Sequence, residues 1–337
     1  MFESARLLAV LLLLPLAANA DVLFESDAPI AFRLEGPVTT WTAERDKEKA
    51  YPGRISWEGE SFPVEVTLRG NHRLKKSSCR YPPLRLEFDK EVRSDTIFDK
   101  QKDIKLVVQC KPGGRFLDYL RVEYLTYQAL ALLTPLSYQA RWVELTYVDT
   151  DGEQEPRVEP AFFVERKARL AKRVGLETTD VERISVDALD ADQAALIALF
   201  QFVIANADYS MVAPPPGDVC CHNAKLLIDA DNRYIPVIYD FDSAGLVDAS
   251  YALPAGMLGQ TDVRQRFYRG YCAHNDAVTR ARDQLLALQT RLTALFDSDP
   301  LLSNRQKKKA VKFLDAGFDI LKTPRRFDRE IIGECRG

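Results

Sequence analysis

Two aspartates separated by one aromatic residue end an apolar run in the segment VIYDFDSAG, residues 237–245. Carboxylates in this position have two interpretations. Asp240 and Asp242 either enter an ordinary turn after a β-strand, or the strand delivers them to a site where they bind a metal ion. Carboxylate and amide oxygens are the ligands that Mg²⁺ and Mn²⁺ prefer, so the second interpretation requires further oxygen donors elsewhere in the chain.

Such donors precede the segment. The apolar runs NAKLLID (223–229) and YIPVIYD (234–240) flank a polar turn and predict a β-hairpin. Asn223 opens this hairpin and Asp240 closes it, while Asp208 follows a predicted helix. Phosphoryl transfer from ATP uses this combination of groups. One carboxylate receives or orients the proton of the attacking hydroxyl, and an amide and a carboxylate hold magnesium on the phosphates.

Other chemistries lack their residues. His72, His222 and His274 are too scattered to indicate a zinc site, and no Ser-His-Asp triad can be inferred from them. Asp240 and Asp242 as a glycosidase pair would have to flank a sugar bond, which two acids on one short turn rarely do. The chain has 46 Lys and Arg against 49 Asp and Glu, so it lacks the basic excess of a nucleic-acid-binding protein.

The elements that must position these residues fall into two groups along the chain. Alternating apolar and polar residues predict strands in the first half, interrupted by one helix over 116–133. The second half predicts helices, with Asp190 as the N-cap of the helix that precedes Asp208. The predicted strands lie near residues 30–35, 64–69, 83–88, 103–110 and 140–148, and the later helices lie at 191–207, 276–297 and 303–322.

The first twenty residues have the pattern of a secretory signal peptide. An apolar core, LLAVLLLLPLAA, follows Arg6, and Ala18 and Ala20 provide the small residues of a cleavage site. We therefore expect an exported protein, periplasmic or extracellular, with no membrane-spanning segment after cleavage. The six cysteines are expected to form disulfides, with adjacent Cys220 and Cys221 bridging to different partners rather than to each other.

The order of these motifs resembles that of the CotH family, atypical secretory-type protein kinases named after a spore coat protein. The family combines an Arg-Gly-Asn or Arg-Gly-Ser turn, basic residues and a strand with a helix containing Leu-Arg, a strand ending in a glutamate-bearing segment, an N-x-D loop, an Asn and a D-x-D. The corresponding segments are LRGNHRLKKSSCRYPPLRLEF (68–88), FLDYLRVEYLTYQAL (116–130), PAFFVERK (160–167), NAD (206–208), HN (222–223) and YDFD (239–242). The resemblance spans roughly residues 54–250.

This resemblance implies a site for ATP with Mg²⁺ or Mn²⁺. It makes Asp208 the catalytic base or the carboxylate that orients the substrate, with Asn206 bracing its loop. Asn223 and Asp240 correspond to the metal ligands. Asp242 either binds a second metal ion or orients Asp240.

The cation that binds the phosphates stays open between several residues. Arg85 and Lys105 both lie in predicted strands, and the resemblance does not decide between them. Arg69, with Lys75 and Lys76, lies where it could reach phosphates from a flexible loop.

The resemblance also implies an acidic partner and a fold. Glu123 is the expected partner of the phosphate-binding cation, and Glu165 marks the connection between two lobes near the adenine. We expect a two-lobed, kinase-like α+β fold. After the signal peptide at 1–20, a strand-rich N-lobe occupies 21–160 and a helical C-lobe with the catalytic hairpin occupies 161–337.

The expected function is transfer of phosphate from Mg- or Mn-ATP to hydroxyls of a secreted or envelope protein. Two alternatives stay open, because Asp208 and Asn223 are fifteen residues apart instead of five, and no GxGxxG loop is present. One alternative is an inactive, pseudokinase-like module that binds an envelope protein or a glycan. The other is a different nucleotide transfer, such as AMPylation.

Overall fold

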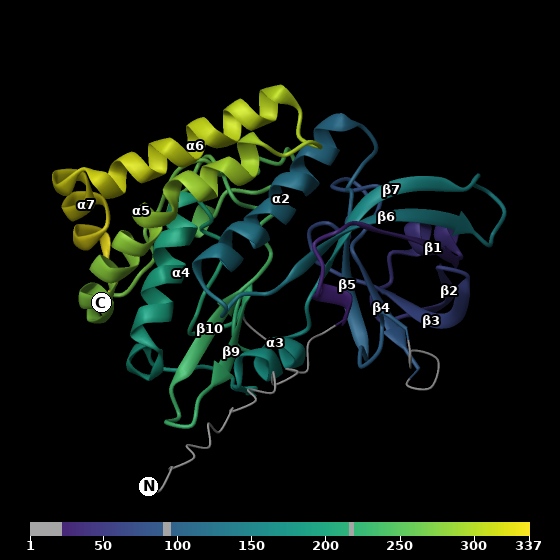
Figure 1. Cartoon of the computed structure of the whole chain (residues 1–337), viewed down its shortest axis with the longest axis horizontal. Coiled ribbons are helices and arrows are strands. Elements are labelled where there is room, and N and C mark those ends of the chain that lie inside the picture. The colour runs from purple at the N-terminus through teal and green to yellow at the C-terminus, as the bar shows by residue number, and fades with distance from the viewer. Residues whose placement is uncertain (1–21, 90–95, 216–218) are drawn as a thin grey trace, which may run out of the picture.

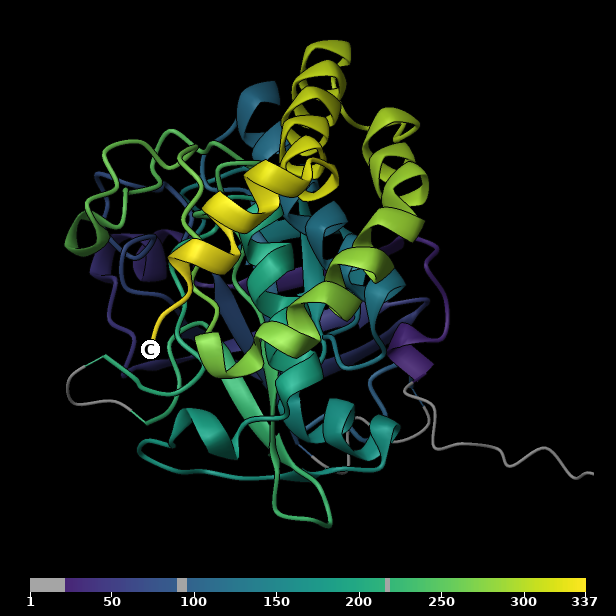
Figure 2. The same ribbon diagram turned by 90° about the vertical axis from the view of Figure 1, so that its left-hand side faces the viewer.

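The computed structural model describes residues 22–89, 96–215 and 219–337. The predicted signal peptide, residues 1–20, lies outside the described residues. Most strands gather on one side of the molecule and most helices on the other (Figure 1). Figure 2 views the molecule from the helical side. The expected mixture of α and β structure is confirmed.

Seven strands of the described chain form a closed barrel in the order β1-β2-β3-β4-β5-β7-β6. Neighbouring strands are antiparallel, except that β1 and β6 run parallel and close the barrel. Apolar side chains from alternate positions fill its interior, as the two-residue period of a strand dictates. The strands are β1 (Ile30–Gly36), β2 (Ala50–Trp57), β3 (Glu60–Leu68), β4 (Leu84–Phe88), β5 (Asp103–Val108), β6 (Ala140–Asp149) and β7 (Arg157–Val164).

The expected two-lobed kinase-like fold is wrong, because this sheet closes on itself. Ile30 of β1 lies opposite Val143 of β6, and β7 is inserted between β5 and β6. Alternation of apolar residues identifies each strand but contains no information about its neighbours, so the sequence did not reveal the closure. The expected boundary between residues 160 and 161 falls inside β7 and stays a prediction.

The helices form a second hydrophobic core beside the barrel. Helix α2 joins the two parts, since it packs against β6 and β7 and against α5. The helices are α1 (Val38–Glu44), α2 (Gly114–Leu133), α3 (Lys167–Val174), α4 (Ala191–Val203), α5 (Asn275–Asp297), α6 (Asn304–Lys322) and α7 (Pro324–Glu330). Short 3₁₀ turns lie at Val22–Phe24, Val186–Ala188, Gly256–Leu258, Cys272–His274 and Ile332–Glu334.

The predicted hairpin is confirmed as part of a second, small sheet. Strands β9 (Ala224–Ile228) and β10 (Tyr234–Ile238) pair antiparallel, and the short β8 (Glu177–Thr178) pairs with β9. The predicted N-cap of α4 is also confirmed, because an Asp190 carboxylate oxygen accepts a hydrogen bond from the Gln193 backbone N–H at 2.9 Å.

The cysteines lie in pairs at disulfide distance, in agreement with the predicted disulfides. Cys79 pairs with Cys110 and Cys272 with Cys335, with Cα–Cα distances of 4.7 and 5.0 Å. The prediction that Cys220 and Cys221 bridge to different partners is wrong, because they pair with each other. None of the helices in the described part of the chain is long and apolar enough to span a membrane.

Candidate functional site

The open end of the β9–β10 hairpin brings Asn223 and Asp240 together. The backbone N–H of Tyr239 donates a hydrogen bond to the Asn223 carbonyl oxygen at 3.0 Å. Asn223 and Asp240 have φ angles of 48° and 68°, a region that is uncommon outside glycine and that clusters at functional sites. The Asp240 N–H donates to the Tyr127 hydroxyl of α2 at 2.9 Å, which fixes this end of the hairpin to the helix.

Asp208 lies beside Asn223, on the loop that follows α4. Its Oδ1 lies 2.6 Å from His222 Nε2, and its Oδ2 accepts a hydrogen bond from Asn223 Nδ2 at 3.1 Å. Asn206 Oδ1 accepts a bond from the Asp208 backbone N–H at 3.0 Å and braces the loop. The hydrogen bond to Asp208 raises the pKa of His222, although burial opposes it.

A buried arginine, Arg73, lies between Glu123 and Asp242. Its Nη1 is 3.9 Å from Glu123 Oε2 and 3.8 Å from Asp242 Oδ2, and its Nη2 donates to the Val108 carbonyl at the end of β5. Burial, together with repulsion from Asp240, raises the pKa of Asp242 to about 7. Burial and repulsion from Asp242 raise the pKa of Glu123 well above its ordinary value. Arg73 opposes both shifts.

Lys105 and Arg69 supply positive charge near Asp240. Lys105 Nζ lies 4.1 Å from the centre of the Tyr239 ring, which directly precedes Asp240. Burial, with repulsion from Arg69, lowers the pKa of Lys105 well below its ordinary value, and attraction to Asp240 opposes this. Burial and repulsion from Asp208 raise the pKa of Asp240. Acidic and basic side chains therefore lie close together where water reaches them poorly.

These side chains line one cavity of about 380 Å³, a size within the range of small-molecule sites. Its polar walls come from β5, α2, the loop after β3, the loop after α4 and both strands at the open end of the hairpin. The residues predicted from sequence that line it are Arg69, Lys105, Glu123, Asp208, Asn223, Asp240 and Asp242.

The structure distinguishes between two of the cation candidates, Arg85 and Lys105. Arg85 of β4 lies opposite Lys105 of β5, but Lys105 lines the cavity and Arg85 lies outside its described lining. Arg85 Nε is instead 3.8 Å from Asp103 Oδ1. Lys75 and Lys76 are exposed and also lie outside that lining. Of these candidates, Lys105 and Arg69 are the ones that line the cavity.

Glu165 and Asn206 support the structure around the cavity without lining it. Glu165 is fully buried, and its Oε2 accepts hydrogen bonds from Arg173 Nη2 at 2.9 Å and from the Gln139 backbone N–H at 3.1 Å. These bonds connect α3 to the chain segment before β6. Asn206 is buried and holds the Asp208 loop.

Arg73, His222, Tyr127 and Lys225 are among the residues of the cavity wall that sequence reasoning did not predict. His222 directly precedes Asn223, and Tyr127 lies four residues after Glu123, on the same helical face. Those two spacings are signals that could have identified them. No pattern distinguishes Arg73 from the other basic residues of its segment, because its burial depends on how the loop folds over β5.

The oxygen donors at the hairpin fit a divalent cation that shares its coordination with a ligand. Among the described residues, no group of three or more His, Cys, Asp or Glu side chains is placed to hold a metal ion alone. The amide of Asn223 and the carboxylates of Asp240 and Asp242 offer a few oxygen ligands. Mg²⁺ uses sites of this kind when substrate phosphates provide its other ligands. Burial raises the pKa values of Asp240 and Asp242, and a bound divalent cation would favour their ionised forms.

No family model matches the sequence, and no curated protein matches it either. The resemblance to the CotH family therefore stays a prediction from the motifs.

Proposed function

We propose that the chain binds ATP with Mg²⁺ or Mn²⁺ in this cavity and transfers the γ-phosphate to a hydroxyl of a secreted or envelope protein. This is the activity that the resemblance to the CotH family implies. One observation supports it above the others: Asp208, Asn223 and Asp240, from separate segments, line the same cavity as the cations Lys105 and Arg69.

In this proposal Asp208 orients the attacking hydroxyl. Its side chain is 44 % exposed, so a ligand in the cavity can reach the carboxylate. His222 and Asn223 bind one oxygen each and thereby fix its orientation. A carboxylate that is held in place accepts the hydroxyl hydrogen, the role that phosphoryl transfer requires of it.

The remaining polar residues serve the nucleotide. Lys105 and Arg69 bind phosphate oxygens, because they line the cavity near Asp240 and, unlike Arg73, do not bridge Glu123 and Asp242. Asn223 and Asp240, with Asp242, would hold the metal ion, which when bound neutralises phosphate charge and fixes the orientation of the phosphates. Arg73 keeps Asp242 and Glu123 in place as the bridging cation between them.

The proposal rests on the site and not on the fold. The closed barrel removes the kinase-like architecture as an argument, but one chemistry recurs on unrelated folds when the same groups converge. The secreted substrate follows from the export predicted for the chain. Mass spectrometry of the mature N-terminus tests that prediction, and it should find Asp21 as the first residue.

The first experiment measures thermal stabilisation by ATP with Mg²⁺ or Mn²⁺. A ligand at a hundred times its Kd stabilises a protein by about 2.7 kcal/mol, so a rise in Tm is expected for the parent chain. Asp240→Ala should abolish most of that rise. Asp231→Ala is the matched control, because it removes an 82 % exposed carboxylate at the other end of the same hairpin. A parent chain that ATP does not stabilise contradicts the proposal.

The second experiment follows the label of ATP onto a mixture of envelope proteins. Transfer of γ-labelled phosphate that Asp208→Asn lowers at least a hundredfold supports the kinase. Transfer from α-labelled ATP instead would identify AMPylation. Nucleotide binding without any transfer would favour the inactive binding module.

A further inference from the structure

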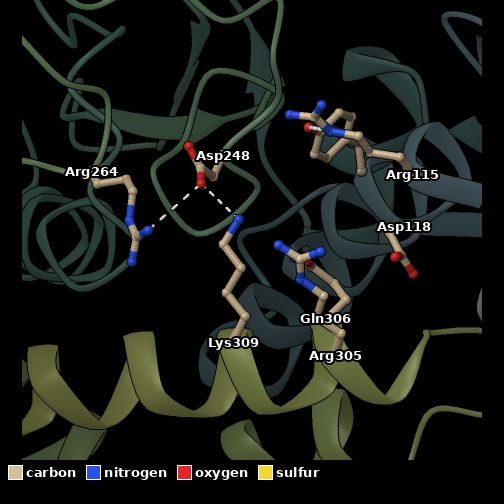
Figure 3. Close-up of a pocket in the computed structure, with 8 residues that line it drawn as sticks. Arg115, Asp118, Asp248, Arg264, Arg305, Gln306 and Lys309 are labelled. Atoms are coloured by element: carbon tan, nitrogen blue, oxygen red, sulfur yellow. Dashed lines mark hydrogen bonds and ion pairs between the residues drawn. The ribbon is translucent and has the colours of Figure 1, made fainter.

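A second cavity, of about 670 Å³, lies outside the candidate nucleotide site. It is formed by the first turns of α2 and α6 and by the segments around Asp248 and Arg264 (Figure 3). Its lining residues are Arg115, Asp118, Tyr119, Asp248, Arg264, Arg305, Gln306 and Lys309. We call it the basic cavity, because four of these described residues are cations and two are acids.

Both acids of the basic cavity are already engaged. Asp118 Oδ1 and Oδ2 accept hydrogen bonds from the Ser303 backbone N–H at 3.0 Å and hydroxyl at 2.7 Å, at the start of α6. Asp248 Oδ2 accepts a bond from Lys309 Nζ at 2.6 Å and lies 3.8 Å from Arg264 Nη1. Asp248 is therefore paired with two cations, whereas Asp118 is hydrogen-bonded to Ser303, a neutral residue.

Arg305 and Arg115 are the two cations of the basic cavity that have no acidic partner among the described residues. Arg305 is exposed and forms no hydrogen bond or ion pair with any other described residue. Arg115, also exposed, has the neutral Tyr119 hydroxyl as its hydrogen-bond partner. Figure 3 shows Arg305 extending from α6 into the same space that Arg115 borders from α2. Neither of these two guanidinium groups forms an ion pair with another described residue.

Gln306 provides an independent sign that an acceptor is missing. Its side chain lines the basic cavity and is only 6 % exposed, yet its Nε2 has no hydrogen-bond partner among the described residues. Buried amide donors in folded proteins are almost always paired. If the Gln306 side chain rotates towards the cavity, an anion bound there supplies the acceptor that this amide lacks.

We infer that the basic cavity binds the phosphate group of a phosphate monoester. Arginine forks pair with phosphate and carboxylate oxygens, but donors on α2 and on α6 approach from different directions. A tetrahedral oxyanion has acceptors on several sides, whereas a carboxylate has them in one plane. The volume of about 670 Å³ exceeds that of the ion itself, so the phosphate is attached to a larger body. The inference does not depend on the proposed kinase activity.

The test is calorimetric titration of the full chain at constant ionic strength. The probes are O-phosphoserine, glucose 6-phosphate and inorganic phosphate, with serine and glucose as uncharged counterparts. Both esters should bind at least as tightly as inorganic phosphate, and serine and glucose should not bind. Binding of inorganic phosphate alone would overturn the ester assignment, and binding of none of the three would overturn the whole inference.

Substitutions on α6 locate the binding. Arg305→Gln should weaken O-phosphoserine binding roughly tenfold, the usual effect of losing a charge-assisted hydrogen bond. Lys308→Gln is the matched control, because Lys308 is an exposed cation of the same helix that lies outside the described cavity lining. Equal weakening by both substitutions would show a general charge effect and would overturn the site.

Two further variants separate this site from the nucleotide cavity. Gln306→Leu should also weaken O-phosphoserine binding, while its Tm reports whether the chain still folds. Lys105→Gln should bind O-phosphoserine as the parent does, because Lys105 lines the other cavity. Loss of binding in Lys105→Gln would assign the anion to the nucleotide cavity and overturn the inference.

Discussion

The guanidinium of Arg73 is the cation nearest to two buried carboxylates at once. Glu123 and Asp242 are 2 % and 8 % exposed, so water stabilises their charges poorly. Their pKa values are raised even with Arg73 present. Removing one member of a buried ionic group is costly, because it leaves charges buried without a partner.

Arg73→Met tests this dependence. It keeps the length of the side chain but removes its charge, and should lower the free energy of unfolding by about 3 kcal/mol at pH 8. Because a raised pKa means that folding favours the protonated acid, the loss should shrink as the pH falls below about 7, the pKa of Asp242. Urea denaturation at several pH values measures it. Arg73→Lys retains a charge and should lose less, and a pH-independent loss in Arg73→Met would contradict the explanation.

At the scale of elements, the carboxylate of Asp149 attaches the helix α1 to the end of β6. Asp149 Oδ1 accepts a hydrogen bond from the Thr39 backbone N–H at 3.0 Å, and Oδ2 accepts one from the Thr39 hydroxyl at 2.7 Å. Burial alone would raise the pKa of Asp149, but these bonds outweigh burial and lower it. A lowered pKa means that the folded state favours the ionised form.

Asp149→Asn should therefore destabilise the protein by about 1–3 kcal/mol at neutral pH, the range for hydrogen bonds to a charged group. That contribution to stability is fully present at pH values above 3.8, the ordinary pKa of Asp. It disappears as the pH falls through the lower pKa that Asp149 has in the folded state. Denaturation midpoints at pH 7 and pH 3 measure the change. Asp151→Asn is the control, because the exposed Asp151 accepts one bond, from the Thr40 backbone N–H, and should matter less.

The segment that follows Asp242 passes close to another part of the chain at Gly245. A Cβ atom there would lie 2.5 Å from the Val263 carbonyl oxygen and 2.7 Å from the Arg264 Cα. Gly245→Ala should therefore lower the Tm, with a cost of about 1–3 kcal/mol for overpacking. Gly114→Ala, at an open position at the start of α2, should leave the Tm unchanged or raise it slightly. Equal effects of the two substitutions would contradict the close approach.

Local sequence patterns predicted the hairpin, most barrel strands and the cap of α4, because each depends on residues close together in the chain. The strand β2 was missed, since Pro52 and Gly53 interrupt its pattern. The pairing of β1 with β6 joins distant segments and leaves no local signal. For the site, the hairpin ends were predictable, but the burial of Arg73 and the pairing of Cys220 with Cys221 depend on tertiary structure.

At the scale of the whole molecule, two disulfides connect distant segments. Cys79–Cys110 links the loop that contains Arg73 to the end of β5, and Cys272–Cys335 ties the C-terminal end to the start of α5. Their sequence separations are 31 and 63 residues, whereas Cys220 and Cys221 are adjacent. Because a disulfide that closes a longer loop removes more entropy from the unfolded chain, these two disulfides should stabilise the fold much more than Cys220–Cys221 does.

Replacing either distant pair by serines should lower the free energy of unfolding by about 4 kcal/mol, as the chain-entropy relation gives for these loop lengths. The double serine variant of Cys220 and Cys221 is the control, and it should lose far less, because no long loop is opened. Urea denaturation of the three variants compares them. A control variant as unstable as the other two would contradict the entropic explanation.

Helix α2 borders both cavities. Arg115 and Tyr119 at its start line the basic cavity, while Glu123 and Tyr127 farther along line the candidate nucleotide site. Eight residues of helix separate Arg115 from Glu123 by about 12 Å, and a helix moves along its axis as a nearly rigid rod. A ligand at one end that displaces α2 thus also displaces the groups at the other end. By thermodynamic reciprocity, the factor by which a phosphate ester changes nucleotide affinity equals the factor by which the nucleotide changes ester affinity.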